Sequence, residues 1–297
     1  MKTRSSSNSR PPLRTLYAFL IVIVVLYAMP RNADAQLYVL LNNVSQIGNV
    51  SEYSLKGELI NSNFITGLAD PAGIAVSGNN LFVTDNVTDT VGKYDATTGG
   101  AINAGFIMGL QSPFAIAVLG NNLFVTYYTG QNHYAVGEYD ATTGVAINAN
   151  LITGLTQPLG SRCWTTNSSY DCNDQKWGDF FTVGKYGATT GAAINAKFIT
   201  NLNLFAAEDN TLYGAVDNHN IGKYDATTGA VIDRSFIKVR VPLMLALLGN
   251  RLFLAKAVAQ FTSGTVSEYD ATTGAVISPN LIPGLYLPQG IAVRRTK

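Results

Sequence analysis

The side chains of this chain that could bind an ion or a polar ligand gather in three short segments. Two are rich in Asp and Asn, "DNVTDT" from Asp85 and "DNHN" from Asp217, and the third is "YYTGQNH" from Tyr127. Carboxylate and amide oxygens are the ligands that hard divalent cations prefer, and Tyr offers an apolar ring with a polar tip. The candidate ligand-binding residues are therefore Asp85, Asn86, Asp89, Tyr127, Tyr128, His133, Asp217, Asn218, His219 and Asn220.

A structural role competes with ligand binding in these segments. Asp and Asn are favoured in turns because they bond their own backbone and tolerate a positive φ. The only two histidines, His133 and His219, have no evident orienting partner, and a catalytic His needs one. No Ser-His-Asp spacing, phosphate-binding glycine loop or zinc-type Cys/His set occurs. The sequence therefore predicts no catalytic residue, no metal site and no cofactor, except that a divalent cation could bind in these loops.

A repeated decapeptide defines the elements that must position the loops. "KYDATTGGAI" from Lys93 recurs with small changes, and "SEYSLKGELI" is an earlier divergent copy. Six copies spaced 38 to 47 residues apart are typical of a β-propeller, in which each repeat is a four-stranded blade. The tyrosines that mark the copies are Tyr53, Tyr94, Tyr139, Tyr186, Tyr224 and Tyr269.

The second repeat illustrates the four strands expected in each blade. Strands are expected at residues 71–76, 81–84, 91–95 and 101–107, separated by the turn "SGNN", the loop "DNVTDT" and the turn "ATTG". In this arrangement the loop between the second and third strands shares a face with the Pro-containing connections between blades. The candidate residues above therefore lie on one face of the predicted propeller.

The turn of the decapeptide has a structural explanation. The Asp side chain can accept bonds from the amides of the turn, and the Gly can take the left-handed conformation that closes it. The fourth copy has Gly187 in place of the Asp. The predicted structural residues are Asp95, Gly99, Asp140, Gly144, Asp225, Gly229, Asp270 and Gly274.

The two ends of the repeat region complement each other. The first copy has no innermost strand before "LYVLL", and "PQGIAV" from Pro288 has no blade after it. The segment 288–294 is therefore expected to close the first blade, which removes the open sheet edges. This count predicts an all-β, six-bladed propeller over residues 36–294, with blades of about 45 residues and a tail at 295–297.

The pattern "P-x-GIAV-x-x-NNLFVT…VGKYD" resembles NHL-repeat propellers and is similar to the six-bladed superfamily of senescence-marker and gluconolactonase-type lactonases. The resemblance covers about residues 36–294. A lactonase-type enzyme of this superfamily holds a divalent metal with Glu, Asn and Asp side chains that converge on the central channel. Apart from Glu208 and Gln289 the innermost strands are apolar, so the metal site is not carried over to any residue here.

The fourth repeat, at about residues 157–198, is irregular over residues 161–180. This stretch contains the only cysteines, Cys163 and Cys172, and both tryptophans. It could be a loop pinned by a disulfide in an oxidising compartment, or a Trp-rich binding lip. Read in a shifted frame, residues 160–170 can also encode Ile-Ala-Val-Leu-Asp-Asn-Lys-Leu-Phe-Val, the strands that the repeat lacks. We favour this third interpretation, an out-of-frame segment.

The N-terminal segment 1–35 is typical of a signal peptide, with a basic start, an apolar run at residues 16–29 and a small-x-small site at residues 33–35. Its removal takes five of the 20 basic residues and one of the 19 acidic residues, which leaves 15 and 18 and a net charge of −3. Such a chain has no excess positive charge for nucleic acid.

These observations favour a secreted or periplasmic monomer that uses inter-blade loops as a binding or scaffolding module. The expected partner is a protein, a glycan or a surface polymer, with no nucleic acid and no membrane after signal cleavage. The alternative is a degenerate metal-dependent lactonase or related hydrolase. Fold alone does not give function, so an acidic cluster at the channel mouth would favour the alternative, and an apolar channel would favour the binding module.

Overall fold

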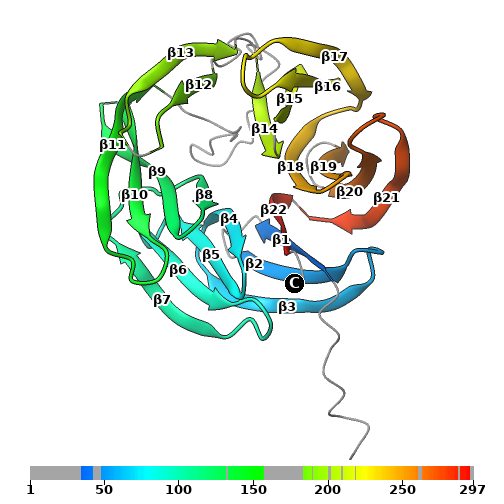
Figure 1. Ribbon diagram of the computed structural model, residues 1–297. Helices are drawn as coiled ribbons and strands as arrows, with labels where there is room; N and C mark the ends of the chain where they lie inside the picture. The colour runs from blue at the N-terminus through cyan, green and yellow to red at the C-terminus, as the bar shows by residue number, and fades with distance from the viewer. Residues whose placement is uncertain are drawn as a thin grey trace, which may run out of the picture. The chain divides into compact units, whose positions relative to one another are not determined.

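The computed structural model consists of β-strands joined by turns and loops (Figure 1). None of the residues it describes forms a helix long and apolar enough to cross a membrane. The described residues are 35–42, 48–131, 133–156, 183–188, 190–199, 202–208, 210–217, 219–259, 263–286 and 288–294.

Each complete repeat folds into one antiparallel sheet of four strands. In the second repeat these strands are β4 (Pro71–Ser77), β5 (Asn80–Asp85), β6 (Thr90–Asp95) and β7 (Ala101–Met108). The central strand β5 is buried on both faces, and its apolar run "LFV" fits that position. The first half of the outer strand β7 is exposed and reads "AINA". The strands thus begin and end within two residues of the predicted bounds.

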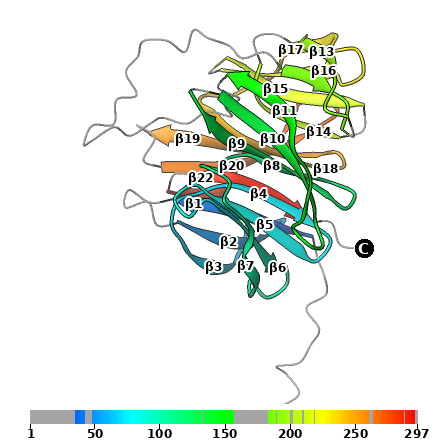
Figure 2. The ribbon, with the colours of Figure 1, turned by 90° about the vertical axis from the view of Figure 1, so that its left-hand side faces the viewer.

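Four further sheets have the same plan (Figures 1 and 2). The first contains β22 (Pro288–Arg294), β1 (Gln36–Asn42), β2 (Gly48–Ser54) and β3 (Leu59–Leu68). The third repeat gives β8 (Ile116–Leu119), β9 (Asn122–Gly130), β10 (His133–Asp140) and β11 (Ala146–Thr156). The last two sheets contain β14 (Asn203–Glu208), β15 (Thr211–Asp217), β16 (Asn220–Asp225) and β17 (Val231–Lys238), and β18 (Pro242–Leu248), β19 (Arg251–Ala259), β20 (Ser263–Asp270) and β21 (Val276–Leu285).

The prediction of six four-stranded blades is wrong. The described residues form five such blades, and the fourth repeat gives only a two-stranded sheet of β12 (Val183–Tyr186) and β13 (Ala193–Ile199). The reason lies in the sequence between residues 157 and 182. It does not carry the apolar strand pattern of the other repeats and falls outside the described residues. The repeat sequence resumes only at the third and fourth strands, with "VGKY" and "AINAKFI".

The predicted closure of the first blade by the C-terminal segment is confirmed. Strand β22 pairs antiparallel with β1, with Gln36 opposite Arg294 and Leu37 opposite Val293. The sheet order β22-β1-β2-β3 joins strands from both ends of the repeat region. β22 also contacts β4 and β18, so that both neighbouring blades meet it, and Figure 2 shows β1, β4 and β22 side by side.

The hydrophobic core lies between successive sheets. One cluster joins β1, β2 and β3 to β5 and β6, a second joins β5 and β6 to β9 and β10, and a third joins β15 and β16 to β19 and β20. The innermost strands β22, β4, β8, β14 and β18 lie toward the centre in Figure 1. In the second repeat, for example, β5 and β6 are accordingly more buried than β4.

Two faces can be defined by their connections. The turn face holds the β4–β5 and β6–β7 turns and their equivalents in the other blades. The loop face holds the β5–β6 loop, its equivalents and the connections between blades. Asp85 binds the backbone N–H of Ala69 in such a connection, at 2.7 Å, which places the β5–β6 loop on the same face as the connection.

Candidate functional site

The decapeptide turn on the turn face is closed by its own side chains. Oδ1 of Asp95 accepts hydrogen bonds from the backbone N–H of Thr97 and Thr98, both at 2.8 Å. Oδ2 of Asp95 accepts from Nδ2 of Asn79 in the β4–β5 turn, at 2.7 Å. The same pattern recurs at Asp140, Asp225 and Asp270. The Asp therefore joins two turns of one blade.

These bonds lower the pKa of the turn carboxylates. For Asp270 the largest cause is the backbone N–H of Thr273, followed by the hydroxyl of Thr273, with smaller contributions from Thr272 and Asn250. Asp140 and Asp225 have a lowered pKa for the same first cause, the N–H of the second Thr. The hydrogen bonds of each turn thus stabilise the ionised form of its Asp carboxylate.

The turn glycine contacts the preceding sheet. Gly99 has a φ of 75°, and a Cβ at this position would lie 1.9 Å from the carbonyl oxygen of Phe64 on β3. The equivalent contact occurs at every boundary between successive sheets, the one with the two-stranded sheet included. The pairs are Gly57 with Leu281, Gly144 with Phe106, Gly191 with Leu151, Gly229 with Phe198 and Gly274 with Phe236. Only Gly fits this contact, since it combines a positive φ with a close backbone approach.

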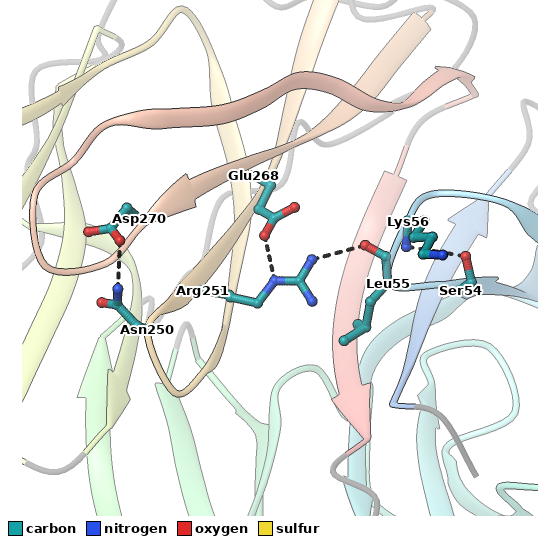
Figure 3. A network of polar contacts seen from close by, with 7 residues as sticks. All are labelled: Ser54, Leu55, Lys56, Asn250, Arg251, Glu268 and Asp270. Carbon is teal, nitrogen blue, oxygen red and sulfur yellow. Dashed lines mark hydrogen bonds and ion pairs between the residues drawn. The ribbon is translucent and has the colours of Figure 1, made fainter. Parts of the chain in front are cut away.

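A cation also reaches the turn of a neighbouring blade. Nη2 of Arg251, on β19, donates to the carbonyl oxygen of Leu55 in the turn after β2, at 3.0 Å, while Nε pairs with Glu268 (Figure 3). The turn carboxylates and several turn carbonyl oxygens are thus bonded within the protein. On the turn face these bonds hold turns and blades together.

On the loop face, both carboxylate oxygens of Asp85 accept hydrogen bonds from backbone N–H groups. Its carboxylate accepts from the N–H groups of Ala69, Asp70, Val87 and Thr88, at 2.7 to 3.2 Å. The side chain is buried at the end of β5. It shapes the β5–β6 loop and attaches it to the connection between two blades, so it is a poor ligand for an added cation.

The neighbouring Asn86 belongs to a different arrangement. Its Nδ2 donates to Oδ2 of Asp70 at 3.3 Å, and its backbone N–H donates to the carbonyl oxygen of Asp70 at 3.0 Å. Oδ1 of Asp70 accepts from Nδ2 of Asn42, at the end of β1, at 2.6 Å. One buried carboxylate therefore lies between two carboxamides from different blades.

Asp89 fastens the other side of the same loop. Its Oδ1 accepts from the N–H of Ser112 at 2.8 Å, and its carbonyl oxygen accepts from Leu110 at 3.3 Å. Asp89 has a φ of 55°, which Asp tolerates better than most residues. The loop is thus bonded to the connection before its blade by Asp85 and to the connection after it by Asp89.

The β15–β16 loop is tied internally. Oδ1 of Asp217 accepts from the N–H of His219 at 2.7 Å, and Nδ2 of Asn220 donates to both carboxylate oxygens. The carbonyl oxygen of His219 accepts from Val239 in the following connection. Asn218 lies outside the described residues. These bonds are those of an Asx-type turn.

The β9–β10 hairpin presents aromatic side chains from its strands, so the predicted loop position of Tyr127, Tyr128 and His133 is wrong. Tyr128 meets Tyr134 edge to face, with ring centroids 5.2 Å apart, and its backbone N–H donates to the carbonyl oxygen of Gln111 in the preceding connection. The hydroxyl of Tyr127 donates to the carbonyl oxygen of Ala149 at 2.9 Å. Burial raises the pKa of Tyr127 and of Tyr134, and His133 is exposed. This end of the hairpin therefore offers two partly exposed rings and one exposed imidazole.

The structure thus leaves the nine described candidates on three separate blades. Asp85 and Asn86 are consecutive in sequence but bond to different groups, and Tyr127 and Tyr128 are neighbours on β9. His133 and His219 lie on different blades. The described part of the chain has no group of three or more His, Cys, Asp or Glu side chains that could hold a metal. A lactonase-type acidic metal site therefore does not fit these residues. Cys163 and Cys172, the cysteines of the disulfide alternative, lie outside the described residues.

Comparisons with known proteins give no family. No family model matches the chain, and no curated protein matches it. Among solved structures, the computationally designed protein Ika8 shares 12% identity, with 88% of this chain and 78% of that chain covered and a TM-score of 0.44. A chain of a nidogen/laminin complex shares 16% identity over 88% and 86%, with a TM-score of 0.39.

Two residues of the loop-face network are not among the sequence candidates. Asp70 stands before Pro71 in the connection, where the third repeat has Ser112 and the last has Val241. Asn42 and Asn86 occupy equivalent positions in their blades. Each lies five residues after a Leu, Leu37 or Leu81, that pairs with the Tyr of the decapeptide. Alignment of the connections, in addition to the loops, would have indicated Asp70 as the one acidic residue at this position.

Proposed function

We propose that this chain is a secreted or periplasmic β-propeller, related to NHL-type propellers, that binds a protein, glycan or surface polymer through its loop face. Residues 1–35 act as the signal peptide, and the exported chain works as a monomer. It needs no catalytic residue and engages neither nucleic acid nor membrane.

One observation carries this proposal, the difference between the two faces. Turns of nearly identical sequence cover the turn face, and their polar groups bond to one another and to the next blade. The loops of the loop face differ from blade to blade in sequence and in the side chains they expose. Binding residues are concentrated on variable loops held by a rigid scaffold.

The loop-face end of the β9–β10 hairpin is the best candidate for the contact surface. Tyr rings supply apolar area at a low cost in conformational entropy and carry a hydroxyl that can bond a polar partner. Tyr128 is already held by Tyr134 and by the backbone of Gln111. A ring fixed in this way can stack on the apolar face of a sugar or on a side chain without first being ordered.

Binding of the purified full chain to a glycan array, and to immobilised surface polymers and proteins of its host, tests the proposal. Tyr128→Ala and His133→Ala should reduce the response of a positive partner by tenfold or more. Lys56→Ala, in an exposed turn on the turn face, should leave the response unchanged. A partner lost with Lys56→Ala but kept with both loop variants would overturn the assignment of the loop face.

A further inference from the structure

The carboxylate of Asp70 sits between two carboxamides at the boundary of the first and second blades. Nδ2 of Asn42 lies 2.6 Å from Oδ1, and Nδ2 of Asn86 lies 3.3 Å from Oδ2. Asp70 is 7% exposed and Asn42 is 9% exposed. The three side chains come from the end of β1, from the connection before β4 and from the loop after β5.

The oxygens of both carboxamides are without a hydrogen-bond partner. Oδ1 of Asn42 and Oδ1 of Asn86 are each buried and accept no hydrogen bond. Buried side-chain acceptors are nearly always satisfied, and an exception often marks a site where a water or an ion binds. Two such oxygens beside one buried carboxylate are therefore an unusual concentration of acceptors.

A half-turn of each carboxamide about its last bond exchanges the nitrogen for the oxygen. Both Asn oxygens would then face the carboxylate of Asp70. Without a cation that arrangement is repulsive, whereas a bound cation would be attracted to the oxygens of all three side chains. Oxygen ligands from Asp and Asn, completed by water, are those that Ca²⁺ takes in its flexible coordination shell.

We propose that Asn42, Asp70 and Asn86 bind a hard divalent cation, with Ca²⁺ as the best fit. Asp85 is no ligand, because its oxygens are occupied by four backbone N–H groups. It fixes the loop that carries Asn86 and the connection that carries Asp70. The cation joins β1, in the blade that β22 closes, to the connection before β4 and the loop after β5 of the next blade.

Thermal unfolding and titration calorimetry of the full chain with CaCl2, after removal of metal by a chelator, test this site. Calcium at a hundredfold excess over its Kd should raise the melting temperature by roughly 5 °C or more. MgCl2 should give a smaller rise, because Mg²⁺ demands a stricter octahedral geometry. No calorimetric binding and no rise with either salt would overturn the proposal.

Two variants and one control locate the site. Asp70→Asn and Asn86→Ala should each abolish the calcium-dependent rise, and Asn86→Ala decides if Asp70→Asn does not fold. Asp217→Asn changes the residue that matches Asn86 in the β15–β16 loop, and it should leave the rise intact. A rise that survives both site variants would place the cation elsewhere. The measurement needs no partner, so its outcome is independent of the proposed binding function.

Discussion

Nζ of Lys93, on β6, donates a hydrogen bond to the carbonyl oxygen of Ala141, 2.9 Å away in the turn of the next blade. The same ammonium group lies 3.3 Å from the carbonyl oxygen of Thr142 and 4.8 Å from the ring centroid of Phe106. A cation thus meets two backbone oxygens and an aromatic face at a boundary between blades. Such charge-assisted bonds are roughly twice as strong as neutral ones.

Other boundaries repeat this contact with different residues. Lys223 donates to Ala271, Arg251 to Leu55, and Arg294 to Ala96 with Tyr38 beside it. Where the decapeptide begins with Glu268, the cation comes from Arg251 on the adjacent strand β19. At this boundary the "E" form of the decapeptide thus reaches the same contact as the "K" form, a cation over the turn of the following blade, whereas Glu138 is bonded by Asn122 instead.

Substitution of Lys93 by Met should lower the free energy of unfolding by roughly 2 kcal/mol, because a buried charged donor to two carbonyl oxygens is lost while the apolar stem is kept. Urea unfolding with linear extrapolation measures the change. Lys238→Met, at an exposed position on β17, is the control and should stay within about 0.5 kcal/mol of the original chain. Equal losses in the two variants would show that the contact contributes nothing.

Substitution of Gly99 by Ala should cost far more than the same change at Gly78. Both glycines have a positive φ, 75° and 56°, but a Cβ at Gly99 meets the carbonyl oxygen of Phe64 whereas one at Gly78 meets nothing within 4 Å. The left-handed conformation alone costs an Ala about 1 to 2 kcal/mol, and the clash should add roughly 2 kcal/mol. Guanidinium unfolding of both variants gives the difference, and equal values would mean that the blades move apart freely.

Much of this fold could be predicted from the sequence because each blade is a local unit. The short apolar strand segments, the glycine turns and a repeat period near 45 residues predict the strands of the β4–β7 blade to within two residues of their observed ends. The closure by β22 also follows, since one end lacks the strand that the other end supplies. The number of four-stranded blades could not be derived this way. The count relied on the spacing of the Tyr residues, and spacing does not show whether the intervening residues pair as strands.

The candidate site was predictable in part for a related reason. Loop position follows from the order of strands within a blade, so the face that carries Asp85 and Tyr128 could be inferred. The partners of these residues depend on how successive sheets stack. Asn42 and Asp70, 28 residues apart, meet only because β1 and β4 lie next to each other. No local pattern encodes that relationship.

Acid should destabilise the propeller through its turn carboxylates. The pKa of Asp270 is lower in the folded chain than in the unfolded chain, chiefly because the N–H and the hydroxyl of Thr273 bond the ionised form. A lowered folded pKa means that the stabilisation is present above the unfolded value, near 3.9, and is lost as the pH falls through the folded value.

The triple variant Asp140→Asn, Asp225→Asn and Asp270→Asn should therefore lose less stability than the original chain between pH 5 and pH 3. Urea midpoints at intervals across this range measure the slope, and the pH 7 midpoints provide the baseline for each protein. Parallel pH profiles for the two proteins would contradict the role of the turns in acid sensitivity.

Thr84, on β5, bonds its own blade to the segment that leads into the next blade. Its buried hydroxyl accepts from the N–H of Gly73 on β4 and donates to the carbonyl oxygen of Phe114, both at 2.8 Å. Thr84→Val keeps the shape and removes both bonds, so it should lower the free energy of unfolding by about 2 to 3 kcal/mol. Thr84→Ser keeps the hydroxyl and removes one methyl group, which should cost about 1 kcal/mol. Urea unfolding of both variants separates the two effects, and a larger loss for Ser than for Val would show that packing of the methyl group, rather than the hydroxyl bridge, holds this boundary.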